Sequence, residues 1–293
     1  MKNKIVLMFV PFLLVGCASK SGGSSNNSTP TPTPSVTVPQ GFEQTGSVSE
    51  TRRGSKISTS EANQIIEEIR ESSNSFQSEY NDNPDKFIED AQEFSYYFKN
   101  KIDDVSDMTS RVNYSRSAQF FSQHLTSSVV DEGEIYIMDF THYEYVLNNQ
   151  FVTAYTNNVS GKTDVDYHPI EEYTTDGIFT YLAEMILNIG NVTKDMLSQN
   201  DNYAGIAEQS SASGISIEYY SSGKGNLFIR MNMESFGIYL ETLFEDCWLT
   251  YEYMYTDLTK LMSGSGYSMP YQRMMSELNI NYGRAEIAYP VTK

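Results

Sequence analysis

The feature that most constrains the fold of this chain is a change in the spacing of its apolar residues. Between residues 59 and 105, apolar side chains recur every three or four positions, the period of a helix with one buried face. From Gly133 onward they alternate, as in Ile135 and Ile137, which is the period of a strand. We therefore expect an α+β domain in which N-terminal helices pack on antiparallel β meanders.

Local signals place the expected helices. Ser58-Thr59-Ser60-Glu61 has the form of a capping box, in which a hydroxyl and a carboxylate bind free backbone amides. A second helix is expected from Asn83-Pro84 to Val105, since proline suits the first helical turn. A third is expected over residues 175–197. Their apolar stripes are more typical of a core than of a cofactor site.

Turn signals place the expected strands. Asn148-Asn149 tolerates the left-handed backbone of a tight hairpin between residues 143–147 and 151–155. A second hairpin is expected across SSGKG, between residues 213–220 and 226–233, and a third around Glu245-Asp246. The last strand is expected at Ala285–Tyr289.

Two regions of the chain resemble each other. GEIYIMDF, from Gly133, is similar to GNLFIRMN, from Gly225, and VLNNQFVT, from Val146, is similar to LFEDCWLT, from Leu243. A duplicated helix-then-meander unit would explain this, with repeats at residues 59–160 and 175–262. Chance similarity between alternating strands is the other explanation.

The charge of the chain excludes one class of partner. It carries 38 acidic against 20 basic residues, a net charge of -18. Such a chain repels phosphate backbones, because binding to nucleic acid needs clustered Lys and Arg. We expect no nucleic-acid partner, and a neutral or cationic partner if the acidic surface selects one.

The first twenty residues carry a targeting signal. Lys2 and Lys4 precede the apolar run Ile5–Val15, which is too short to cross a bilayer as a helix of roughly 20 residues. Residues 14–17 read L-V-G-C, and the segment resembles a bacterial lipoprotein signal peptide. The resemblance implies that residues 1–16 are removed and that Cys17 is acylated. The protein would then be held by acyl chains at an extracytoplasmic membrane face of the cell envelope: the outer membrane of a diderm host, or the outer face of the plasma membrane of a monoderm one.

The residues after the predicted anchor are typical of a linker. Residues 17–58 are rich in Ser, Thr, Pro and Gly, lack apolar periodicity and are expected to be disordered. The globular domain is expected at residues 59–293. With Cys17 acylated, Cys247 has no disulfide partner, so the domain depends on its core.

The sequence contains no clear catalytic or metal site. His142 and Glu144 share a face of one expected strand, but a metal site needs three or four convergent donors. Asp164 to His168 is a similar fragment in an expected loop. Cys247 is expected within an apolar strand, where burial would raise the pKa of its thiol. We therefore expect a non-enzymatic protein without cofactor or metal. A hydrolase that uses two paired carboxylates is an alternative, because any two of the acidic residues could lie close together in the fold.

The chain contains 22 tyrosines against one tryptophan, and 13 methionines. In the strand expected after Asp246, Leu249 would share a face with three tyrosines. Tyrosine and methionine side chains suit an adaptable apolar surface, although a core uses them equally. The residues expected to contact a ligand are Tyr251, Tyr253, Met254 and Tyr255.

These features favour a tethered binding domain for an apolar ligand such as a lipid. Helices followed by meanders behind an acylated N-terminus are similar in outline to periplasmic carriers of lipids and lipoproteins of the LolA type. The alternative is a cell-envelope module for protein–protein interaction or adhesion, with a filled core and an exposed aromatic face. An envelope hydrolase is the third.

Overall fold

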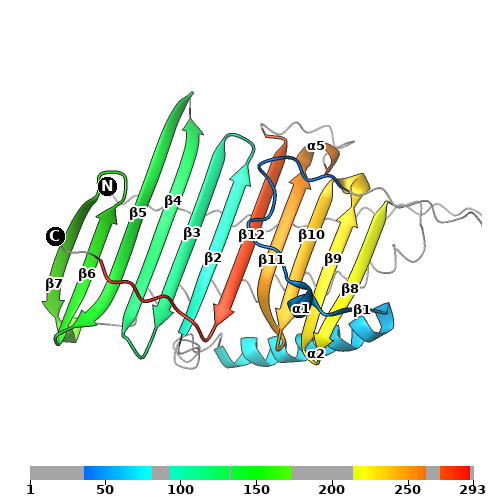
Figure 1. Ribbon diagram of the computed structural model, residues 1–293, viewed down its shortest axis with the longest axis horizontal. Helices are drawn as coiled ribbons and strands as arrows, with labels where there is room; N and C mark the ends of the chain where they lie inside the picture. Colours follow the sequence, from blue (N-terminus) through cyan, green and yellow to red (C-terminus); the bar gives the residue numbers. More distant parts are fainter. Residues whose placement is uncertain (1–35, 81–92, 132, 173–213, 262–270, 291–293) are drawn as a thin grey trace, which may run out of the picture. The chain divides into compact units, whose positions relative to one another are not determined.

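The computed structural model of this protein describes residues 36–80, 93–131, 133–172, 214–261 and 271–290. Twelve strands form one antiparallel sheet in the order β1-β8-β9-β10-β11-β12-β2-β3-β4-β5-β6-β7 (Figure 1). Their bounds are β1 Ser55–Ile57, β2 Glu93–Ile102, β3 Ser106–Ser115, β4 Phe120–Asp131, β5 Glu134–Leu147, β6 Gln150–Asn157, β7 Lys162–Pro169, β8 Ile215–Gly223, β9 Asn226–Met233, β10 Ile238–Glu245, β11 Trp248–Asp257 and β12 Arg273–Tyr282. The described helices are α1 Glu50–Arg53, α2 Thr59–Tyr80 and α5 Leu258–Leu261, with short 3-10 turns η1 Ile170–Glu172 and η2 Glu234–Phe236.

The predicted α+β class is wrong, because the protein is mainly antiparallel β-sheet. Residues 93–102, expected in a helix, form β2, which pairs with β3 on one side and with β12 on the other. Phe94, Tyr96 and Phe98 alternate within this stretch, and aromatic residues favour strands. The segment therefore fits both periods, and pairing with the next strand, β3, and with the distant strand β12 decides between them. β3 and β4, which are rich in Ser and Thr, and β12 were not predicted, and β7 was predicted as a loop.

The first predicted helix is confirmed together with its cap. The Ser58 backbone N–H donates to Glu61 Oε2 at 2.9 Å, and the Glu61 N–H donates to Ser58 Oγ at 3.3 Å. Ala62, Ile66 and Ile69 are buried on one side of α2. The capping box and the apolar stripe thus act as predicted.

The three predicted hairpins are confirmed. Asn148 and Asn149 have φ angles of 50° and 59° between β5 and β6, as a tight hairpin turn requires. Asp246 and Cys247 adopt the same conformation between β10 and β11, so Cys247 lies in a turn and not within a strand. No strand forms at Ala285–Tyr289, where the Tyr289 ring packs edge-on against Phe120 and Tyr145.

Residues 36–58 are not a disordered linker. Val36 and Phe42 are buried, α1 follows, and β1 pairs with β8. We call residues 36–48 the strap, because they cross β9 to β12 on one face of the sheet (blue in Figure 1). The ordered unit begins earlier than predicted, because a strap held by hydrogen bonds to distant strands has no periodicity of its own.

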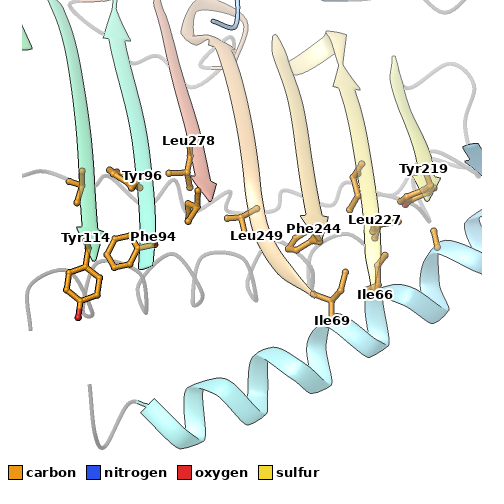
Figure 2. Packing of buried hydrophobic residues seen from close by; sticks show 14 of the residues in the cluster. Ile66, Ile69, Phe94, Tyr96, Tyr114, Tyr219, Leu227, Phe244, Leu249 and Leu278 are labelled. Atoms are coloured by element: carbon orange, nitrogen blue, oxygen red, sulfur yellow. The ribbon is translucent and has the colours of Figure 1, made fainter. Parts of the chain in front are cut away.

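The sheet has two faces with different coverings. The strap face presents Phe228, Leu243, Tyr251, Tyr253, Tyr255 and Met275, which form one buried cluster with Val36 and Phe42 of the strap. The other face, here the helix face, receives α2: Ile66 and Ile69 lie beside Leu227, Phe244 and Leu249 (Figure 2). Alternation along each strand separates the two sets of side chains.

A β-bulge in β11 changes which residues share a face. Leu243 pairs with Tyr251 and Phe244 pairs with Leu249, so Thr250 is one residue too many. Leu249 consequently packs in the helix-face cluster, whereas Tyr251 packs under the strap. The prediction that Leu249 and the tyrosines share a face is therefore wrong.

Some sequence-based predictions concern residues outside the described ranges, namely Cys17, the signal segment 1–16 and the helix at 175–197.

The similarity noted between VLNNQFVT and LFEDCWLT does correspond to two hairpin turns of the same backbone type. The preceding blocks differ, however, because residues 134–147 form one strand and residues 226–245 form two. The different strand arrangements of these two regions therefore do not support a duplicated unit. Within the described ranges, no helix has the length and apolarity needed to span a membrane.

Candidate functional site

The helix face carries two separate clusters of buried apolar side chains. The larger cluster includes Phe244, Leu249, Leu278 and Ile280 and extends to β3 and β4. The smaller cluster contains Ile215, Met231, Met233, Ile238 and Leu240 on β8 to β10. Half-buried Ile217 contacts both clusters, and half-buried Met254 packs against the smaller one.

Two polar residues lie where the clusters meet. Thr242 of β10 and Glu252 of β11 are directly opposite each other, and Glu252 is also opposite Leu278 of β12. This register makes Leu240 of the smaller cluster and Phe244 of the larger one diagonal neighbours of Glu252. A carboxyl and a hydroxyl therefore occupy the junction of an otherwise apolar surface.

Neither polar residue has a partner among the described residues. Thr242 is only 4% exposed, and its Oγ1 accepts or donates no hydrogen bond in the described part of the chain. Glu252 is half-buried, and no hydrogen bond or ion pair joins it to any residue that the structure describes. Unpaired buried polar atoms are uncommon in folded proteins, and each one points to a specific cause.

The same strands pair their other buried acids. On the strap face, Glu241 accepts from Arg230 Nε at 2.9 Å and from the Tyr239 hydroxyl at 2.6 Å. Glu277 accepts from the Thr45 and Gly46 backbone amides of the strap at 2.8 and 3.0 Å. Glu252 is thus exceptional among the acids of this part of the sheet.

Burial changes the acidity of Glu252. Desolvation by the surrounding protein raises the pKa of its carboxyl to about 7, well above the usual value for glutamate. No neighbouring charge contributes to this shift. The group is therefore close to half ionised at neutral pH, and it would gain from a cationic or hydrogen-bonding partner.

The structure does not bring together the four residues expected to contact a ligand. Tyr251, Tyr253 and Tyr255 are buried under the strap, where the Tyr253 hydroxyl donates to the Phe42 carbonyl and the Tyr251 hydroxyl donates to Gln44 Oε1 at 3.2 Å. They belong to the core. Met254 alone lies on the helix face, beside the junction.

The histidines form separate polar pairs. His142 Nε2 lies 3.0 Å from Glu144 Oε1, His124 Nε2 lies 2.9 Å from Asp139 Oδ1, and His168 contacts Thr153. Among the residues that the structure describes, no three His, Cys, Asp or Glu side chains are placed to hold a metal ion.

Cys247 is not activated. Burial raises the pKa of its thiol, and the carboxylates of Glu68 and Asp246 raise it further. The direction is the one expected from the sequence, although the residue lies in a turn. A raised thiol pKa disfavours the thiolate that nucleophilic chemistry requires.

A scan against models of known protein families and a search of curated proteins both found no match to this chain.

Thr242 and Glu252 were not predicted as site residues from the sequence. One sequence feature could have indicated the site: Glu252 is an acidic residue among the aromatic and apolar residues of β11. The bulge at Thr250, which simple alternation does not reveal, puts Leu249 on the same face as Glu252 and so brings Glu252 next to the larger apolar cluster.

Proposed function

We propose that this protein is a membrane-tethered, extracytoplasmic binding protein that holds an apolar ligand on the helix face of its sheet. Cys17 would be the acylated residue, and two or more acyl chains would anchor it durably. The ligand would lie across the junction formed by Thr242, Glu252 and Met254.

The observation that carries the proposal is the unpartnered pair Thr242 and Glu252 between two apolar clusters. Leaving a buried polar group unsatisfied costs about 1–3 kcal/mol. A ligand with an apolar body and one polar group would cover the half-buried side chains and supply the missing hydrogen bonds. Small-molecule sites combine apolar lining with few polar groups in this way.

Binding without catalysis is the simpler interpretation of this site. The direct cross-strand neighbours of Glu252 are Thr242 and Leu278, neither of which titrates near neutral pH. General acid–base chemistry would need a second group of matched pKa close to the reacting atoms.

Native mass spectrometry of the full chain purified from its own host, in a lipid-compatible detergent, tests the proposal. We expect a bound mass in the apolar-ligand range that organic extraction removes. Met254→Trp fills the junction and should lower ligand occupancy severalfold, whereas Tyr155→Trp, an exposed site on β6, should not. A clean unliganded mass, or equal occupancy in both variants, would contradict the proposal.

One observation favours a second function, docking of a partner protein. β6 pairs with β5 only from Phe140, so residues 134–138 of β5 extend beyond it with one edge that no described strand pairs (Figure 1). Ile135 and Ile137 are 66% and 67% exposed, and Tyr136 and Met138 are also exposed. An apolar free edge is a template for an added strand.

The charges at this edge select the kind of strand it would accept. Asp131 and Glu134 are exposed beside it, so the partner segment should alternate apolar with basic residues. A labelled peptide of alternating isoleucine and lysine should bind the wild type and bind Ile137→Lys at least tenfold more weakly. The same peptide with prolines at alternate positions, which cannot complete the ladder, is the control. Equal binding of both peptides would contradict strand addition.

A further inference from the structure

Resting on the proposed function, we infer that the ligand carries an amine at its polar end, and that Glu252 and Thr242 bind this ammonium group between the two apolar clusters. The ligand class is therefore a cationic amphiphile with a long apolar chain.

The hydrogen-bonding capacity of the two residues fits an ammonium group. An ionised carboxylate only accepts hydrogen bonds, and a threonine hydroxyl can accept as well. An ammonium group has three donors and no acceptor. Because Thr242 and Glu252 are directly opposite on adjacent strands, one such group can donate to both.

Charge argues against an anionic head group. The chain has a net charge of -18, and the described residues opposite Glu252 offer no cation that would neutralise a phosphate or carboxylate. On the strap face the equivalent role for Glu241 is taken by Arg230, a resident cation. On the helix face the cation would come from the ligand.

The surroundings of Glu252 define the rest of the ligand. Leu240, Met254, Phe244 and Leu278 present apolar atoms on both sides of the polar pair. An alkyl chain lying against them would be removed from water, and each buried methylene would increase the affinity. A small hydrophilic amine would lose this gain and should bind weakly.

The other titratable groups on this face do not replace Glu252. Among the described residues they are Tyr219 of β8, Tyr96 of β2, Tyr114 of β3, Tyr282 of β12, Cys247, and Glu68 and Arg70 of α2, with Arg70 paired to Glu67. Desolvation alone accounts for the raised pKa of Glu252. Because the carboxylate form binds the ammonium, affinity should increase as the pH rises through about 7.

The test uses delipidated full-length protein, the neutral fluorescent reporter N-phenyl-1-naphthylamine, and three competitors of equal chain length: dodecylammonium, dodecanol and dodecanoate. We expect dodecylammonium to displace the reporter at a concentration at least tenfold lower than dodecanol at pH 8, and dodecanoate to be weakest. At pH 6 the advantage of the ammonium should shrink severalfold.

Variants assign the preference to the junction. Glu252→Gln should abolish the ammonium preference and its pH dependence while retaining dodecanol binding, and Thr242→Val should weaken the preference. Glu286→Gln, which removes an exposed carboxylate elsewhere, should behave as wild type. Equal affinities for the three competitors, or a preference that survives Glu252→Gln, would overturn the inference and leave the proposed function standing. Failure of the reporter and of every competitor to bind would overturn both.

Discussion

Glu241 and Glu252 point to opposite faces of the same pair of strands, and only Glu241 is neutralised by an arginine. Glu241 opposes Tyr253 in the β10–β11 register, while Glu252 opposes Thr242 one position along. Glu241 is 3% exposed and bound by Arg230 and Tyr239. Glu241 therefore belongs to the packed face under the strap. Glu252 lies on the helix face, where it has no hydrogen-bond partner among the described residues.

Replacing Glu252 should stabilise the unliganded protein at neutral pH. Its folded-state pKa, about 7, lies above that of an unfolded glutamate, so the folded state holds the proton more tightly. The contribution of Glu252 to the free energy of unfolding therefore falls as pH rises from about 4.5 to 7 and stays lowered above that. Glu252→Gln should be more stable than wild type by about 1–3 kcal/mol at pH 8 and nearly equal at pH 4.5. Urea titrations at the two pH values measure this; a constant difference would contradict it.

Removing the partner of Glu241 should have the opposite effect. Arg230→Ala leaves a buried carboxylate with only the Tyr239 hydroxyl, and breaking a buried ion pair costs about 3–5 kcal/mol. We expect the lower end of this range, because the Arg230 side chain is partly exposed. Lys162→Ala, which removes the exposed pair with Asp164, should cost less than about 0.5 kcal/mol. Similar losses in both variants would refute the distinction.

Two glycines with similar positive φ angles should respond differently to alanine. Gly54 has φ 76°, and a Cβ there would lie 2.1 Å from the Ser221 carbonyl oxygen. Gly133 has φ 84°, with no atom within 4 Å of such a Cβ. Gly133→Ala should cost about 1–2 kcal/mol from the left-handed backbone alone. Gly54→Ala should cost clearly more, because β1 must move away from β8 as well. Thermal unfolding of the two variants compares them directly, and equal losses would contradict the close approach.

The proposed anchor has a matched control in the same chain. Cys17→Ser should shift the protein from the membrane fraction to the soluble fraction of its own host, because the acyl chains have no other attachment point. Cys247→Ser keeps Cys17 and should leave the protein in the membrane fraction. Fractionation with immunoblotting gives the readout. Retention of the Cys17→Ser variant in the membrane fraction would disprove the anchor.

The candidate site was only partly accessible to sequence analysis. Met254 was expected at a ligand surface and does lie at the junction, but the expected tyrosines are core residues under the strap. Thr242 and Glu252 were not expected. The bulge at Thr250 and the strap hydrogen bonds assign each β11 side chain to its face. The bulge appears only in the pairing of β10 with β11, and the hydrogen bond from Tyr253 to Phe42 joins residues 211 positions apart.

The amino-acid sequence by itself determined the features that depend on residues within about four positions of one another. These are the cap at Ser58 and Glu61, the stripe of α2, the turn at Asn148-Asn149, and the presence of a hairpin turn at Asp246, although the inclusion of Cys247 in that turn was not predicted. Only the tertiary structure decided that residues 93–102 form a strand, that residues 36–48 cover one face, and that Glu252 faces the other. A strand needs a neighbour to bind its backbone groups, and for β2 one of these neighbours is β12, near the other end of the chain.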